Sequence, residues 1–315
     1  MPKVSVCVIT YNQHLYIRDC LESIVRQVTN FEFEVIVGDD GSTDETAQII
    51  QEFVDRYPSL VTHVRHQPKV GGSQNFVDCH NRARGDYVAH MDGDDLMLPG
   101  KLQAQFNALE SNKFLTAVWH RMNFFDDSGR FCSGREADLS PFVNGVVTFD
   151  KAISVGFVSM HSSMMYRRNM RSTAPQGMEI LDLYQVWDVL SLGDGQLLDQ
   201  VLGQYRVNAR GSLTEESKKL NTKSFALDHA RHYFKKFPNM RRSFFLFAIS
   251  RSIYYATIRN RLAFLYLKFA LETLSLVSPR AILDNLRDIY RIQVPWNRRV
   301  LTKGRQIWYQ RFLRF

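Results

Sequence analysis

Three carboxylates fall within four positions of the stretch HMDGDDLMLPGKL, residues 90–102. Asp92, Asp94 and Asp95 follow an apolar run and precede a Leu-Pro-Gly turn. Ionising all three side chains in so small a space requires a counter-charge or abundant water, and a divalent metal ion would supply the charge. A solvated acidic turn is the alternative, because Asp and Gly are common in turns for conformational reasons alone.

Two more polar clusters follow apolar, β-branched runs earlier in the chain. VSVCVIT ends in Thr10 and is followed by Tyr11 and Asn12, and FEVIVG is followed by Asp39 and Asp40. Each is a weak signal alone, since an Asp before Gly-Ser-Thr often caps a helix. The sequence contains neither G-x-G-x-x-G nor G-x-x-x-x-G-K-[ST], so dinucleotide and P-loop sites lose their main support. Together the clusters suggest a nucleotide site in which acids hold a metal.

The elements that must position these clusters alternate between strand and helix. Apolar, β-branched runs predict strands at residues 4–10, 33–40, 60–66 and 86–92. Amphipathic spacing with caps and stops predicts helices at residues 14–27, 41–58 and 73–84. This alternation is typical of an α/β fold with a mostly parallel sheet covered on both faces. Ligands bind such sheets at the carboxyl ends of the strands, so the three clusters should line one crevice.

Length and cysteine usage limit the class of protein. A chain of 315 residues with 45% hydrophobic residues holds one large α/β domain with an appendage, or two modest domains. The widely spaced cysteines predict neither a zinc site nor a disulfide framework, and so a reducing compartment; they are Cys7, Cys20, Cys79 and Cys132. The first residues enter a strand pattern directly, without signal-peptide features, so export is not expected.

Four stretches, in this order and spacing, carry a resemblance to a known family: SVCVITYNQHLYIRDCLESIVRQ, EVIVGDDGSTDET, GGSQNF and ARGDYVAHMDGDD. They resemble the nucleotide-binding half of family 2 glycosyltransferases with the GT-A fold. The resemblance covers roughly residues 3–215, is most specific up to Leu102, and returns at LLDQVLGQYRVNARGSLT. It implies a Rossmann-like catalytic domain over residues 1–215 that binds a nucleotide sugar, often a UDP-sugar, with DGDD as the family's D-x-D signature.

The resemblance also implies how a nucleotide would be held. Tyr11 matches the position that packs against the base, and Asp40 matches the position that accepts a hydrogen bond from it. A carboxylate suits the imide N–H of uracil, because charged acceptors make stronger hydrogen bonds. Asp39 ranks behind Asp40 as a base contact or a cap. Three further positions are expected near the nucleotide: Thr10, Gly72 and Asn75.

The two acids of D-x-D correspond to Asp92 and Asp94. The resemblance implies that Asp94 is the more direct metal ligand, that Asp92 lies nearer the ribose or a metal-bound water, and that Asp95 supports them. Hard oxygen ligands suit Mn²⁺ or Mg²⁺, which would neutralise the diphosphate leaving group.

An inverting transfer also needs a base that takes the proton of the acceptor hydroxyl. In the family this is an Asp in a Glu-Asp pair about eleven residues before a glycine, and Asp182 has that spacing from Gly193. Here Leu181 replaces the Glu, so Glu179 and Asp188 remain alternatives. A plain helix N-terminal acid, stabilised by the dipole, is the non-catalytic interpretation of Asp182.

Four more polar residues near the predicted site are weaker candidates. Strand alternation is taken to turn His90 away from the side used by Asp92, which favours packing over ligation. His161 is expected on a strand, where it could face the sugar. Arg206 and Arg210 could meet phosphates or belong to a solvated basic loop.

The last hundred residues differ sharply in charge from the rest. Residues 217–315 hold 21 Lys or Arg and 4 Asp or Glu, against 19 basic and 28 acidic residues before them. Residues 243–278 are apolar and aromatic but interrupted by charges, so none of the uncharged stretches is long enough for a membrane span. Residues 216–315 are therefore expected to form a basic, amphipathic, helical C-terminal appendage that docks on an anionic membrane surface. Packing on the catalytic domain is the alternative.

The expected function is an inverting, metal-dependent glycosyltransferase that moves a sugar from a UDP-sugar to a saccharide or polyprenyl-linked acceptor in cell-surface polysaccharide synthesis. It would be cytoplasmic and peripherally attached to the inner face of the membrane. A nucleic-acid-binding protein is the alternative from another class, but an acidic crevice repels phosphate, so no nucleic acid partner is expected. A nucleotidyltransferase is the enzymatic alternative, and it would need a basic nucleotide-gripping loop that the sequence does not offer.

Overall fold

The computed structural model describes residues 1–127, 139–172, 178–180, 182–207, 209 and 222–300, with side chains left out at 222–224 and 293–300. Cys132 and Arg210, both singled out above, lie outside the described residues. By its internal contacts the chain divides into two compact units. The sheet unit comprises Met1–Cys132 and Ser159–Lys219, and the helical unit comprises Ser133–Val158 and Leu220–Phe315.

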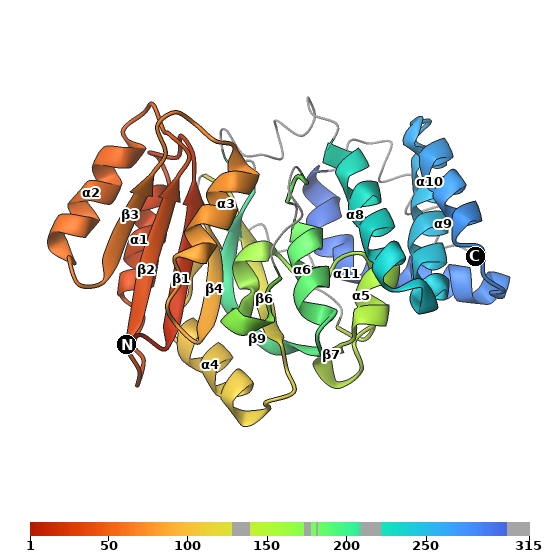
Figure 1. The fold of residues 1–315 in the computed structure, drawn as a ribbon, viewed down its shortest axis with the longest axis horizontal. Coiled ribbons are helices and arrows are strands. Elements are labelled where there is room, and N and C mark those ends of the chain that lie inside the picture. The colour runs from red at the N-terminus through yellow and green to blue at the C-terminus, as the bar shows by residue number, and fades with distance from the viewer. Residues whose placement is uncertain (128–138, 173–177, 181, 208, 210–221, 301–315) are drawn as a thin grey trace. The chain divides into compact units, whose positions relative to one another are not determined.

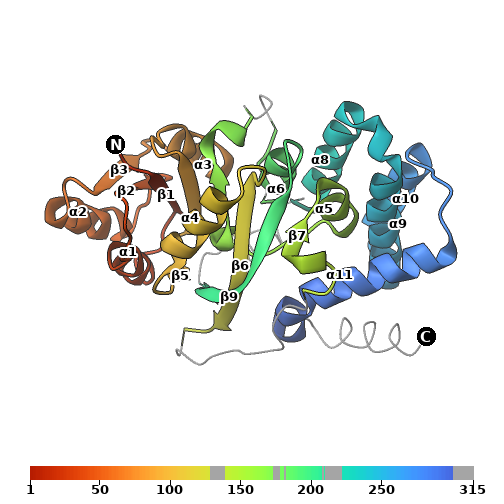
Figure 2. The same ribbon diagram turned by 90° about the horizontal axis from the view of Figure 1, so that it is seen from below.

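The first strands of the sheet unit are β1 (Val4–Thr10), β2 (Phe33–Asp39), β3 (Val61–Arg65) and β4 (Tyr87–Asp92). These four strands are parallel and lie in the order β3-β2-β1-β4 (Figure 1). Beyond β4 the order continues β8-β6-β9-β5. These strands are β5 (Leu96–Met97), β6 (Ala117–Phe125), β8 (Met165–Arg167) and β9 (Gly195–Arg206). The β6 and β9 strands run parallel side by side (Figure 2), whereas β8 is antiparallel to both β4 and β6. The expected α/β fold with a mostly parallel sheet is confirmed.

The helices of this unit are α1 (Ile17–Val25), α2 (Thr46–Arg56), α3 (Gly72–Asn81), α4 (Lys101–Ser111) and α6 (Asp182–Leu190). Their apolar residues recur at helical spacing, so that α1 buries Ile17, Cys20, Leu21 and Ile24 against the sheet. Helix α3 packs across β1 and β2 (Figure 1). Cys7, Cys20 and Cys79 are buried free thiols.

Strand register sets the position of the predicted polar clusters. In the parallel pairs Thr10 lies opposite Asp39, and Ile9 lies opposite Asp92. The three clusters that follow β1, β2 and β4 are therefore level with one another at the carboxyl edge of the sheet, as the sequence predicts.

The helical unit contains α5 (Phe149–Val155), α8 (Thr222–Lys236), α9 (Arg241–Thr257), α10 (Leu262–Glu272) and α11 (Pro279–Val300), with the short strand β7 (Val146–Val147). Helices α9 and α10 pack side by side (Figures 1 and 2). Their interface is aromatic, with the Phe244 and Phe269 rings edge to face and Tyr266 against Phe247. By their contacts, residues 139–158 belong to the same unit as the C-terminal helices.

Helix α10 is apolar on two faces. One face buries Tyr266, Phe269 and Ala270. The other face exposes a row that we name the α10 stripe: Phe264, Leu267 and Leu271, continued after the helix by Leu274. Spacings of three and four residues place the helical members of the stripe on one side. Within the described residues, none of the helices is both long enough and apolar enough to cross a membrane.

Candidate functional site

The turn after β4 brings the acids against the end of β1. Gly93 allows this approach, because a Cβ there would lie 2.5 Å from Gln13 Oε1 and 3.0 Å from Thr10 Cβ. The turn closes when the Asp95 N–H donates to the Asp92 carbonyl oxygen at 3.1 Å. The backbone therefore holds the three carboxyl groups close together.

The three acids of this turn have different surroundings. Asp95 is fully buried, and its Oδ1 accepts the Arg206 backbone N–H at 2.9 Å. Burial, together with the charges of Asp94 and Asp92, raises the pKa of Asp95 well above its usual range. Burial and then the charge of Asp92 raise the pKa of Asp94 to about 7. Asp95 therefore anchors β9, whereas Asp94 carries an electrostatic strain that a cation would relieve.

Asp92 lies beside two side chains that can donate hydrogen bonds to it. Its side chain is 40% exposed, and it lies 3.2 Å from His90 Nε2 through Oδ1 and 3.3 Å from Ser162 Oγ through Oδ2. Burial raises the pKa of Asp92, but the hydrogen bond and charge of His90 outweigh it and bring the value to about 2. Asp92 is thus held as a carboxylate.

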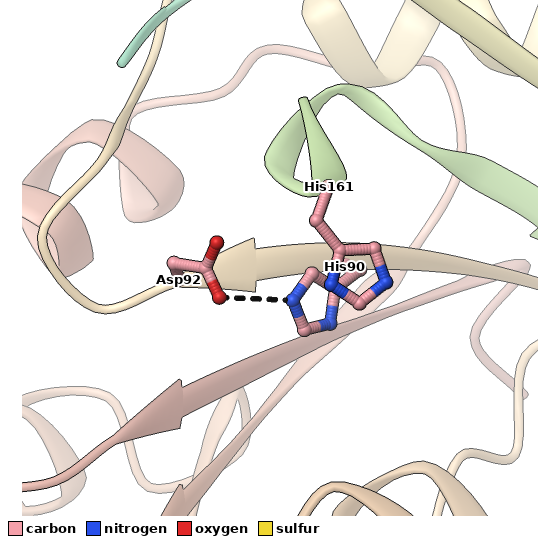
Figure 3. Close-up of side chains that lie close together, drawn as sticks. All are labelled: His90, Asp92 and His161. Atoms are coloured by element: carbon pink, nitrogen blue, oxygen red, sulfur yellow. Dashed lines mark hydrogen bonds and ion pairs between the residues drawn. The ribbon is translucent and has the colours of Figure 1, made fainter. Parts of the chain in front are cut away.

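Figure 3 shows His90 and His161 stacked beside Asp92, with ring centroids 3.7 Å apart. His90 comes from β4 and His161 from a 3-10 turn, His161–Ser163, that precedes β8. The interpretation of His90 as turned away from Asp92 is wrong, because residues two apart in a strand point to the same side. His161 lies in a turn and not, as expected, on a strand.

Behind His90 a chain of hydrogen bonds leads into the core. His80 Nε2 lies 3.0 Å from His90 Nδ1, and His80 Nδ1 lies 2.8 Å from the Tyr166 hydroxyl. All three side chains are almost completely buried. Burial lowers the pKa of His90 to about 4 and that of His80 well below its usual value, so both imidazoles are neutral at pH 7.

Asp182 is the first residue of α6 and approaches His161. Its side chain is 74% exposed, and its Oδ1 lies 3.3 Å from His161 Nδ1. The two alternative bases have other partners: buried Asp188 accepts from the Ser172 N–H at 2.8 Å, and Glu179 accepts from Ser73 Oγ at 2.6 Å. Of the three acids, Asp182 is the one whose carboxylate contacts the histidine pair.

The residues present fit a divalent cation. Within the part of the chain that the structure describes, the ligand atoms of His90, Asp92 and His161 lie within 4.8 Å of one another. Asp94 is close enough to Asp92 for each to affect the charge of the other. Carboxylate oxygens are ligands that suit Mg²⁺ and Mn²⁺. Of the predicted pair, Asp92 thus lies beside two histidines, and His90 has its own nitrogens directed at His80 and Asp92.

The nucleotide-binding candidates lie at the ends of β1 and β2. Asp40 Oδ1 accepts the N–H groups of Val70 and Gly71 at 2.8 and 2.9 Å, which ties down the loop before α3. The Lys69 ammonium lies 3.4 Å from the centroid of the Tyr11 ring. Both residues therefore stand at the expected edge, next to the same loop.

The other expected contacts have structural partners. Asp39 is fully buried and accepts the Ser42 N–H at 2.9 Å, as a turn cap does. Thr10 donates to Gln13 Oε1, and buried Asn75 donates to the Gly38 carbonyl oxygen at 2.9 Å. A Cβ at Gly72 would meet open space. These residues shape the backbone of the site.

Two basic residues in this region donate hydrogen bonds to other groups of the protein. Arg206 lies between the Tyr16 and Phe125 rings and donates from Nε to the Asp94 carbonyl oxygen at 3.1 Å. Lys101 is fully buried and donates to the Ser162 carbonyl oxygen at 2.6 Å. Burial lowers the pKa of Lys101 to about 7. Arg206, expected as a phosphate contact, thus supports the acidic turn.

Sequence reasoning missed His80, Ser162 and Lys101. A faint signal existed for His80, which lies four residues after Phe76 on the apolar face of its helix. Ser162 and Lys101 meet the site only through contacts between distant parts of the chain, for which the sequence holds no pattern.

Comparison with known proteins agrees with this geometry. Residues 5–172 match the family described as Glycosyl transferase family 2. An uncharacterized protein of Mycobacterium tuberculosis is 30% identical over 210 residues, which cover 66% of this chain and 60% of that protein. The chain therefore spans about 60% of the length of this relative.

Solved structures resemble the whole fold. S. aureus TarS 1-349 in complex with UDP has a TM-score of 0.61 at 17% identity and covers 93% of this chain and 90% of its own. The mannosyltransferase PcManGT from Pyrobaculum calidifontis, in complex with GDP-Man and Mn²⁺, has a TM-score of 0.56 at 18% identity, with coverages of 93% and 86%. These likenesses show the fold, which is the expected GT-A type. With the family match covering more than half of the residues, the chain belongs to glycosyl transferase family 2.

Proposed function

We propose that this chain is an inverting, metal-dependent glycosyltransferase that transfers a sugar from a UDP-sugar to a saccharide or lipid-linked acceptor in cell-surface polysaccharide synthesis. The observation that carries the proposal is the stacked pair of His90 and His161, with Asp92 beside the first ring and Asp182 beside the second. Asp94 is a close neighbour of Asp92. A nucleotide donor is further supported by the UDP bound to TarS and the GDP-Man bound to PcManGT.

On the donor side, Tyr11 and Asp40 would recognise the base. Asp40 uses Oδ1 for the loop before α3, and its Oδ2 is suited to accept the imide N–H of uracil. The cation of Lys69 above the ring fixes the orientation of Tyr11. Thr10, Asp39, Gly72 and Asn75 would contribute by holding the backbone around the nucleotide.

On the metal side, Asp94 and Asp92 would hold Mn²⁺ or Mg²⁺, with His161 within reach of the same ion. When bound, the ion neutralises the diphosphate as the glycosidic bond breaks. The raised pKa of Asp94 beside Asp92 supports this assignment, because two crowded carboxylates gain from a shared cation.

In the transfer step, Asp182 would act as the base. The acceptor oxygen forms a bond to the anomeric carbon, the bond from that carbon to the phosphate oxygen breaks, and the acceptor proton passes to Asp182. His161 Nδ1 lies 3.3 Å from Asp182 Oδ1, and a hydrogen on that nitrogen would help to keep the carboxylate charged and oriented. The exposure of Asp182 leaves room for an acceptor hydroxyl.

The test is a calorimetric titration with UDP in the presence of Mn²⁺ and in the presence of a chelator. Wild type is expected to bind UDP about tenfold or more tightly with Mn²⁺, since even a partly screened ion pair contributes 1 kcal/mol or more. Asp94→Ala should abolish this difference, whereas Asp55→Ala, at an exposed acid of α2, should retain it. Equal affinity with and without metal in wild type would refute metal-dependent binding.

We propose further that the helical unit attaches the enzyme reversibly to the cytoplasmic face of an anionic membrane, where a polyprenyl-linked acceptor would be presented. Two observations support this placement. The α10 stripe is exposed, and residues 217–315 carry 21 basic against 4 acidic residues. Exposed apolar side chains among basic ones suit the boundary between headgroups and acyl chains.

A further inference from the structure

Tyr166, His80, His90 and Asp92 form a hydrogen-bonded chain in which the direction of donation can be assigned as well as the distances. Its three contacts measure 2.8, 3.0 and 3.2 Å. Each imidazole uses both of its nitrogens within the chain. A neutral imidazole has one N–H donor and one acceptor nitrogen, so the role of one nitrogen fixes the role of the other.

The direction of every hydrogen bond follows from the last member. An ionised carboxylate only accepts, so His90 Nε2 carries the hydrogen and donates to Asp92 Oδ1. His90 Nδ1 must then accept from His80 Nε2–H. His80 Nδ1 in turn accepts from the Tyr166 hydroxyl. All donors point from the core toward the carboxylate at the sheet edge.

We propose that Tyr166 and His80 are positioning residues that act through His90 to hold the Asp92 carboxylate in one orientation at the donor site. This inference rests on the proposed function, in which Asp92 faces the donor and its metal. The hydrogen-bonded chain runs from β8 through α3 to β4, so two neighbouring elements and one distant in sequence share the task. Hydrogen-bonded supports behind a ligand of this kind fix its geometry and basicity.

Stacking gives the chain a rigid setting. The His80 ring stacks on Phe76 at 3.9 Å, and the His90 ring stacks on His161 at 3.7 Å, measured between centroids. Neither imidazole can rotate without breaking a stack and two hydrogen bonds. The contacts of the chain are buried from Tyr166 to His90, so water does not compete for them.

Histidine nitrogen NMR of the full chain, labelled with ¹⁵N-histidine at neutral pH, tests the arrangement directly. His80 and His90 are both expected as the tautomer with hydrogen on Nε2. His120 is the internal reference, because its Nδ1 faces the Arg121 carbonyl oxygen at 2.8 Å and must carry the hydrogen. A hydrogen on Nδ1 of either His80 or His90 would overturn the proposal.

Two variants separate positioning from general packing. In Tyr166→Phe, His80 loses its donor partner, and its preference for the Nε2–H tautomer should weaken while the His120 signal is unchanged. Asp92→Asn replaces an acceptor-only group with one that can also donate, so both His80 and His90 should shift toward the Nδ1–H form. Unchanged tautomers in both variants would show that Asp92 does not set the direction of the chain.

The functional consequence is measured on His90→Phe, which keeps an aromatic ring against His161. The Mn²⁺-dependent part of UDP affinity should fall by about 10- to 100-fold, while metal-free UDP binding stays close to wild type and reports a folded site. Mn²⁺ dependence equal to wild type overturns the positioning role. If His90→Phe does not fold, the tautomers of wild type and Tyr166→Phe decide. Loss of UDP binding in wild type would instead refute the proposed function and leave the tautomer result standing.

Discussion

Asp182 and Asp188 lie on one helix, six residues apart, and their surroundings separate their roles. Asp188 is buried, and it accepts from both the backbone N–H and the hydroxyl of Ser172. It therefore anchors the start of the segment before α6. Asp182 is exposed, and its Oδ1 lies 3.3 Å from His161 Nδ1. A base must be reachable by its substrate, and that condition favours Asp182.

Replacement of this carboxylate tests its role. Asp182→Asn is expected to lower the transfer rate by about 10²- to 10⁴-fold, the usual contribution of a general base, with UDP affinity nearly unchanged. Glu179→Gln serves as the competing variant, because Glu179 is the other exposed acid in this segment. Single-turnover transfer and UDP titration are measured on both. Near-normal turnover in Asp182→Asn, with loss in Glu179→Gln, would move the base to Glu179.

Which residues were predictable depends on where their partners lie. Asp92, Asp94 and Asp182 were singled out because they match short family motifs beside strand or helix ends, and their roles stay predictions. His80 was not, because its role depends on Tyr166, which is 86 residues away in sequence. The prediction for His90 was wrong because its side chain was assigned to the face of the strand opposite Asp92. A period of two places both side chains on the same face.

At the scale of elements, α5 ends in a way that only glycine accommodates. Gly156 has a φ of 64° and donates its N–H to the Ala152 carbonyl oxygen at 2.8 Å. A Cβ there would lie 2.1 Å from Arg251 Nη2 and 2.9 Å from the Phe247 ring. The same guanidinium stacks on Phe247 at 3.8 Å. Helix α5 is thus joined to α9 through a left-handed turn and an inward arginine.

Gly156→Ala should therefore destabilise the helical unit. The left-handed conformation costs about 1–2 kcal/mol with a Cβ, and displacement of the buried guanidinium adds to this. Urea unfolding followed by tryptophan fluorescence and circular dichroism should show a lower midpoint. Gly72→Ala is the matched control, because its φ is not left-handed and a Cβ there meets open space. An unchanged midpoint for Gly156→Ala would show that the turn relaxes without cost.

The early elements were predictable because each has a local signal. Residues 4–10 form β1 with the expected bounds, and β2, β3, β4 and α1 to α3 lie within or close to the predicted ranges. The packing of α9 against α10 was harder to predict from the sequence. Charged residues in a mixed apolar sequence resemble an interfacial helix, yet Arg251 turns inward and stacks on Phe247. Tertiary packing, which a linear pattern does not record, decides which side of each helix is buried.

At the scale of the whole molecule, basic residues and exposed apolar side chains occur together in the helical unit. Phe264 is 71% exposed and Leu271 is 64% exposed, on a helix that also carries exposed Lys268 and follows exposed Arg261. Each apolar side chain that enters a bilayer contributes roughly 1.5–3 kcal/mol, and each basic one near anionic lipid about 1 kcal/mol. A few of each suffice for reversible attachment.

Liposome flotation measures this attachment. The full chain should float with vesicles that contain phosphatidylglycerol, float less with phosphatidylcholine alone, and detach as salt rises. The pair Phe264→Ser and Leu271→Ser should reduce flotation at least about tenfold, since about 1.4 kcal/mol is enough for that factor.

The control for flotation is a pair of exposed residues of the same two types in the sheet unit. Phe114 is 89% exposed and Leu192 is 51% exposed, and the change of both to Ser should leave flotation as in wild type. If the protein binds none of these vesicles, the α10 stripe does not contact lipid. Equal loss of flotation for the two pairs would mean that the α10 stripe is not a specific lipid-binding surface.

The helical unit consists of two stretches separated by residues 159–219. During synthesis Phe149, Ile153 and Val155, all buried in the finished protein, emerge well before α9 and α11, on which α5 packs. The strands of the sheet unit can pair before α9 and α11, which cover this stretch, have been synthesised. A fragment that stops near residue 215 would keep these apolar side chains in water permanently, so a separately produced catalytic part should bind chaperones or aggregate. The order of translation thus makes the last hundred residues a folding requirement for a stretch that lies far upstream of them.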